Sequence, residues 1–290
     1  MTTMKRVLVA TDLGPGAAAL AHRLGWMAAQ AAVLLIHVID EAALRAAAQW
    51  GLGEIGSLRE RSQALADEQL RRLRDKLHLP PAVPVECHVL DGQPAERVAD
   101  LCRQERIDLL LAGSGNRLWR QALLGSTARR LLRQVDCALW LAREDAEAAQ
   151  QIDRAVLAVD FGNSCGRALS LARQCWPGAS IDAVHVLDSA LVEQAAKLTA
   201  GDPGLLAAEL GAVAQRRLID WLLEQDASDI DARTPLGRPV RSLLAEVTSS
   251  QAQALILGRG DRGDAEASLG GIAEPLTLQA ECDLLIAARS

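Results

Sequence analysis

The chain contains no segment that approaches the roughly eighteen uninterrupted apolar residues typical of a membrane span, although half of its 290 residues are apolar. The amino-terminal residues also lack the basic stretch followed by an apolar run that marks a secretory signal. We therefore expect a cytoplasmic protein with no membrane partner.

Cysteine patterning, charge and enzyme motifs exclude further classes. Six cysteines occur without a C-x-x-C pair, which favours buried thiols over a disulfide framework or a zinc site. A net charge of -6 disfavours nonspecific binding to nucleic acid. Neither a G-x-S-x-G elbow nor a P-loop ending in Gly-Lys-Ser or Gly-Lys-Thr is present. We expect no metal, no nucleic-acid partner and no catalysis.

The sequence does contain a duplication. VLVATD, ending at Asp12, returns as AVLAVD, ending at Asp160, and LLIHVID around His37 returns as DAVHVLD around His185. A set of glycines and one cysteine recurs 145 residues later: Gly113, Gly115, Gly125 and Cys137 become Gly258, Gly260, Gly270 and Cys282. The stretch 143–153 between the repeats is polar and charged, as expected of a linker. We predict two domains, at residues 1–146 and 151–290.

Each repeat alternates short apolar strands with amphipathic helices. In the first repeat we expect strands at residues 5–11, 32–38, 85–90, 107–112 and 138–142, helices at 17–30, 94–104 and 126–134, and a helical hairpin over 40–78. In the second repeat we expect a strand ending at residue 160, strands at 181–187, 230–235, 254–257 and 284–287, and helices at 164–175, 190–198, 204–224, 239–249 and 272–279. Continuous apolar strands alternating with helices predict an α/β fold: two tandem Rossmann-like domains, each a five-stranded parallel sheet covered on both faces.

One stretch, residues 107–142, combines a buried strand, a glycine loop and a helix start. Gly113 and Gly115 open the loop, and Gly125 precedes Ser126 and Thr127 at the start of the helix. Glycines let the backbone approach an anion, and the first amides of a helix point unpaired N–H groups outward. This order is typical of an anion-binding site.

These features together resemble the universal stress protein family, and in particular its tandem members with two such domains in one chain. The resemblance rests on the strands ending at Asp12 and Asp160, on His37-Val38 and His185-Val186, on the G-x-P helix openings and on the glycine loops. It implies repeats that pair as an intramolecular pseudo-dimer, with residues 138–142 beside 284–287. It also implies a stress-response role, and some family members bind ATP while others do not.

In ATP-binding relatives the loop reads glycine, two residues, glycine, nine residues, then glycine with Ser or Thr. The first repeat keeps the gap between Gly115 and Gly125-Ser126, but the first glycine position falls on Ala112, with Gly113 displaced by one. The resemblance places Asp12 near the base or ribose and Val38 beside the adenine. The phosphate candidates are Gly113, Gly115, Asn116, Arg117, Gly125, Ser126 and Thr127.

Each of these candidates also has a structural interpretation. Asp12 fits a turn or a helix cap, Val38 fits a buried strand, and Ser126 and Thr127 fit ordinary caps. His37 and His185 are best explained as structural residues inherited through duplication. In the second repeat the hydroxyl position is Gly271, and three carboxylates (Asp261, Asp264 and Glu266) would repel a triphosphate. If either repeat binds ATP, we expect the first.

The leading hypothesis is a non-catalytic stress-response module that acts by binding. Two versions remain open: ATP held by the first repeat, or nucleotide-independent action in which residues 40–78 and 188–224 form interaction surfaces for protein partners or small ligands. The alternative is an enzyme that hydrolyses ATP slowly, or adenylates a substrate, with the first repeat.

Overall fold

The computed structural model describes residues 4–14, 16–26, 31–77, 79–113, 126–143, 151–259 and 272–289. The chain divides into two compact units, Met1–Gln151 and Ile152–Ser290. Within the described residues, no helix combines the length and the apolar character that crossing a membrane requires.

The first unit alternates strands and helices along the chain. Its elements are β1 (Arg6–Ala10), α1 (Ala17–Trp26), β2 (Ala32–Asp40), α2 (Glu41–Gln49), α3 (Ile55–Asp75), β3 (Val85–Gly92), α4 (Pro94–Gln104), β4 (Leu109–Gly113), α5 (Ser126–Gln134) and β5 (Ala138–Ala142). Its five strands are all parallel, in the order β3-β2-β1-β4-β5. The direction of the strand order therefore reverses between β1 and β4.

The second unit repeats this plan with additions. Its elements are β6 (Arg154–Ala158), α6 (Asn163–Cys175), β7 (Ser180–Val184), β8 (Leu187–Asp188), α7 (Ser189–Thr199), α8 (Pro203–Glu224), β9 (Asp231–Arg233), β10 (Leu236–Gly237), α9 (Pro239–Ser250), β11 (Ala254–Leu257), α10 (Ala273–Gln279) and β12 (Asp283–Ile286). The main strands are parallel, in the order β12-β11-β6-β7-β9. The predicted α/β fold with parallel sheets is confirmed.

Local sequence explains why these elements begin where they do. Strands β1 and β4 are almost wholly buried because helices cover both faces of the sheet, which suits their continuous apolar residues. Helix α4 begins at Pro94, whose missing N–H costs nothing in a first turn, and it buries Val98 and Cys102 one turn apart. Asp40, Asp188 and Asp202 cap α2, α7 and α8 through their side-chain oxygens.

The second unit departs from the predicted five strands because one strand pair is interrupted. In the first unit β2 and β3 pair continuously from Val33 with Val85 to Asp40 with Gly92. In the second unit β7 and β9 pair for three residues, and β8 and β10 then pair as a separate two-stranded sheet. Pro235 lies between β9 and β10, where the first repeat has Leu90, and it has no N–H to donate to the ladder.

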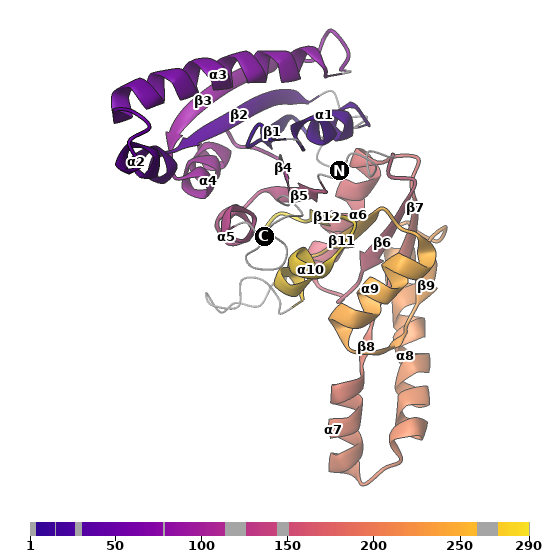
Figure 1. Ribbon diagram of the computed structural model, residues 1–290. Coiled ribbons are helices and arrows are strands. Elements are labelled where there is room, and N and C mark those ends of the chain that lie inside the picture. Colours follow the sequence, from indigo (N-terminus) through magenta and orange to yellow (C-terminus); the bar gives the residue numbers. More distant parts are fainter. Residues whose placement is uncertain are drawn as a thin grey trace. The chain divides into compact units, whose positions relative to one another are not determined.

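The helical hairpins of the two units also differ. In the first unit α3 lies along β2 and β3 (Figure 1). This helix buries Ala66, Leu70 and Leu73. In the second unit α7 and α8 extend beyond β8, away from the main strands of that unit (Figure 1). The exposed leucines of this hairpin include Leu191, Leu198 and Leu205. The repeats thus use equivalent segments differently.

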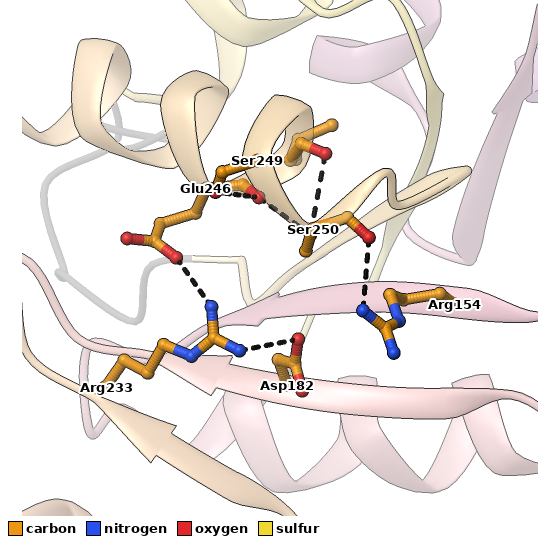
Figure 2. Close-up of polar contacts among 7 residues, drawn as sticks. Arg154, Asp182, Arg233, Glu246, Ser249 and Ser250 are labelled. Carbon is orange, nitrogen blue, oxygen red and sulfur yellow. Dashed lines mark hydrogen bonds and ion pairs between the residues drawn. The ribbon is translucent and has the colours of Figure 1, made fainter.

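A polar network joins β7, β9 and α9 of the second unit (Figure 2). The buried carboxylate of Asp182 lies 3.3 Å from one guanidinium nitrogen of Arg233, and Glu246 lies 3.2 Å from another. The equivalent positions in the first repeat hold Leu34, His88 and Leu101. The second unit therefore ties its edge strand to the sheet with charge where the first unit has apolar side chains at two of the three positions.

Candidate functional site

A cavity of about 610 Å³ lies at the carboxyl ends of the strands of the first unit. It sits where the strand order reverses between β1 and β4, the usual ligand position in open α/β sheets. Four of the predicted site residues line it together: Asp12, Val38, Gly113 and Thr127. They come from three strand ends and from the first turn of α5, so the fold assembles them from distant parts of the sequence.

Of the other candidates, Ser126 is the first residue of α5, and its side chain lies outside the described residues. Gly115, Asn116, Arg117 and Gly125 lie outside them as well.

The carboxylate of Asp12 closes the turn after β1 and also lines the cavity. Its Oδ1 atom accepts a hydrogen bond of 2.8 Å from the N–H of Gly14. Leu13 between them has a positive φ of 60°, and its N–H donates to the hydroxyl of Thr11 at 3.0 Å. Within the described residues Oδ2 has no hydrogen-bond partner. Asp12 therefore closes the turn with one carboxylate oxygen, and the same residue lines the cavity.

His37 braces the end of β1. Its Nδ1 lies 2.9 Å from the carbonyl oxygen of Thr11, and because a carbonyl only accepts, Nδ1 carries the hydrogen. The second repeat preserves this contact, with Nδ1 of His185 lying 2.8 Å from the carbonyl oxygen of Val159. The two repeats therefore share this structural contact, while His37 and His185 also line the cavities of their units.

The amino-terminal turn of α5 borders the cavity. Thr127, Ala128 and Leu131 of this helix line it. The first amides of a helix have no partner within the helix, and the helix dipole adds a partial positive charge at this end. The cavity therefore has an electropositive side made by backbone, suited to an anionic ligand group.

Sequence reasoning missed the wall that the helical hairpin contributes. Ala43, Leu44 and Ala47 of α2 and Leu58 of α3 line the cavity. The signal was present as apolar residues at helical spacing, 43, 44 and 47, but we interpreted the hairpin only as an interaction surface. The cavity consequently has an apolar side opposite its polar strand ends.

Arg59 of α3 links the hairpin to the sheet. Its guanidinium lies 3.7 Å from a carboxylate oxygen of Glu41 in α2 and 3.8 Å from one of Asp91 in β3. Each partly exposed pair contributes little by itself. The two pairs together connect α2, α3 and β3.

The equivalent cavity of the second unit is much smaller, about 140 Å³. Its lining includes Asp160, His185, Val186 and Gly258, which correspond to Asp12, His37, Val38 and Gly113 in the first cavity. Among the described residues, none from α7 or α8 contributes to its lining. The second unit therefore lacks the apolar wall that enlarges the first cavity.

Side chains around Asp160 account for further differences. Its Oδ1 accepts bonds from the N–H of Gly162 at 2.8 Å and from the thiol of Cys165 at 2.9 Å; the first repeat has Ala17 in place of Cys165. Burial, followed by the hydrogen bond to Asp160, raises the pKa of Cys165 to about 12, so this thiol stays protonated.

Phe161, next in sequence, lies with its ring centroid 4.5 Å from that of His185. The guanidinium carbon of Arg217 in α8 lies 4.2 Å from the ring centroid of Phe161, within the range of a cation–π contact. The side chains at this strand end therefore contact one another: Asp160 with Cys165, and Phe161 with His185 and Arg217.

The strand order, the duplicated architecture and the cavities at the strand ends together define a protein with two tandem Rossmann-like α/β domains. The sequence model of the universal stress protein family matches residues 3–143 and again 151–288. The chain therefore belongs to the universal stress protein family, as a tandem member.

Solved structures agree with this fold. The chain is similar to a universal stress protein from Archaeoglobus fulgidus DSM 4304, with a TM-score of 0.68, 19% identity and 98% of each chain covered. It is also similar to a Pseudomonas aeruginosa UCBPP-PA14 protein assigned to the same family, with a TM-score of 0.60, 17% identity, and 98% of this chain and 93% of that chain covered. No protein with curated annotation matches the chain. At these identities the likeness concerns the fold.

Proposed function

We propose that this tandem universal stress protein acts by binding, without catalysis, and that its first unit holds an adenine nucleotide. The observation that carries the proposal is the contrast between the two cavities, about 610 Å³ against about 140 Å³ at equivalent positions. Small-ligand sites commonly fall between about 300 and 1,000 Å³. Only the first cavity reaches that range.

The chemistry of the lining supports a nucleotide. The apolar wall of Leu44, Ala47 and Leu58 suits the faces of a purine ring, and the Oδ2 atom of Asp12 suits a ribose hydroxyl donor. The first turn of α5 would take the phosphates at its unpaired amides. A cytoplasmic stress response, in which occupancy sets the state of the protein, fits these features.

The test is calorimetric titration of the full, nucleotide-stripped chain with ATP and Mg²⁺. We expect one ATP per chain. Ala47→Trp, which fills the cavity, should reduce the affinity at least tenfold, and Ala42→Trp on the same helix, outside the lining, should leave it unchanged. Absence of saturable binding at millimolar ATP would refute nucleotide binding, and stoichiometric release of ADP or AMP would refute the absence of catalysis.

A further inference from the structure

Helix α8 presents an apolar stripe to solvent in addition to the face that it packs against its own unit. Ala214, Leu218 and Leu222 form the buried face. On the outer face Leu205, Ala212 and Ile219 recur every seven residues, which places them in one line along the helix. The side chains of Leu205 and Ile219 are 63% and 44% exposed. Contiguous apolar surface exposed on a protein often marks a protein–protein contact.

Charges flank this stripe in a self-complementary order. Glu209 and Arg216 are also seven residues apart, and both lie on the same side of the stripe. Both are exposed, and neither forms an ion pair with any described residue. The midpoint between Glu209 and Arg216 falls within one residue of Ala212, which is also the midpoint between Leu205 and Ile219.

The shared midpoint near Ala212 favours a second copy of this chain as the partner. A two-fold axis that passes beside Ala212, perpendicular to the helix, places α8 antiparallel to α8 of a second copy. Each residue before Ala212 then faces the residue of the second copy that lies equally far after Ala212. Leu205 then meets Ile219 of the second copy, and Glu209 meets Arg216 of the second copy, in both directions. Ala212 at the axis and the neighbouring Ala208 are small, so the helices approach closely over about 21 Å, the length of fourteen residues.

We propose that the outer face of α8 is a homodimer interface, formed by antiparallel packing against α8 of a second copy of this chain. Both helices of this hairpin, α7 and α8, project away from the main strands of their unit (Figure 1). The interface is separate from the cavity of the first unit, so the proposal does not depend on nucleotide binding.

The first test is sedimentation equilibrium of the full chain over a range of micromolar concentrations. We expect a reversible monomer–dimer equilibrium. Ile219→Glu should weaken dimerisation at least tenfold, because in the dimer it would bury a carboxylate against Leu205 of the second copy. Leu191→Glu is the matched control: Leu191 is 64% exposed on α7, outside the proposed α8 contact, and its replacement should leave the equilibrium unchanged. A wild-type chain that remains monomeric would overturn the proposal.

The decisive test uses the charges. Glu209→Arg and Arg216→Glu should each weaken self-association about tenfold, because each sets like charges together twice in one dimer. An equimolar mixture of the two variants should associate as tightly as wild type, since each altered residue then meets an opposite charge. A dimer that ignores both changes, or a mixture that stays dissociated, would refute the antiparallel α8 contact. All four positions are exposed, and far-UV circular dichroism checks that every variant is folded.

Discussion

The imidazole of His37 donates a hydrogen bond to the backbone carbonyl of Thr11, joining the second strand of the first unit to the end of its first strand. The same bond joins His185 to Val159. Two histidines at matching positions therefore serve the same structural purpose, and neither needs a catalytic role to explain its presence.

We predict that His37→Phe lowers the free energy of unfolding by about 1 kcal/mol, because it removes one part-buried hydrogen bond while keeping a ring of similar size. Guanidinium denaturation followed by circular dichroism measures the change, and His185→Phe is the matched variant. A His37 variant with unchanged stability that abolished an enzymatic turnover would contradict this assignment.

Gly14 lies under the carboxylate of Asp12, and a Cβ at this position would come within 2.9 Å of Oδ1. Since the carboxylate is the end of a short, rotatable side chain, we expect Gly14→Ala to displace it and to break the hydrogen bond that closes the turn, at a cost of about 1 kcal/mol in stability. The loss of one ribose contact should weaken ATP binding about fivefold.

Titration calorimetry of both variants tests this. The equivalent change in the second unit, Gly162→Ala, meets Oδ1 of Asp160 at 3.0 Å and should leave the affinity unaltered. Equal weakening by both substitutions would argue that the effect does not arise in the first cavity.

The carboxylate of Asp182 is almost fully buried, whereas its partner Arg233 is partly exposed. A double-mutant cycle with Asp182→Asn and Arg233→Met should give a coupling energy of about 1 kcal/mol, reduced from the value for a fully buried pair by solvent screening. Chemical denaturation measures the four proteins. A coupling energy near zero would mean that the network shown in Figure 2 does not stabilise the second unit.

Burial raises the pKa of the Cys175 thiol from an ordinary value of 9.0 to about 12. Below pH 9 the thiol is neutral in both folded and unfolded chains. Between pH 9 and 12 it ionises first in the unfolded chain, so the free energy of unfolding falls as the pH rises, by about 1.4 kcal/mol per pH unit for this one group.

Denaturation at pH 9, 10 and 11 should therefore show a shallower decline in Cys175→Ala than in wild type. The absolute stability of the variant will be lower because a small cavity remains, so the slope is the quantity to compare. Parallel slopes would show that Cys175 titrates normally.

Regular elements could be predicted closely where sequence signals were local. The helices Pro94–Gln104 and Ser126–Gln134 and the strand Ala138–Ala142 have the predicted bounds, because proline position and apolar periodicity determine them. The predicted strand 181–187 instead ends at Val184, with Leu187 in β8. That outcome depends on Pro235, which lies across the sheet and far along the chain.

The candidate site was partly predictable for the same reason. Asp12, Val38, Gly113 and Thr127 could be proposed because strand ends and a helix start are visible in sequence. The contribution of Leu44 and Leu58 depends on the angle at which a hairpin packs on the sheet, and the second repeat shows that similar segments can pack otherwise. The pairing of the two repeats stays a prediction.

Leu13 and Phe161 occupy equivalent positions, and both adopt the left-handed backbone region, with φ of 60° and 62°. A side chain in this region costs about 1 kcal/mol relative to glycine. Both repeats carry this cost at the same position, although glycine would remove it. In the second repeat the retained side chain is the ring that contacts His185 and Arg217, so the strained turn holds the aromatic group that links the strand end to α8.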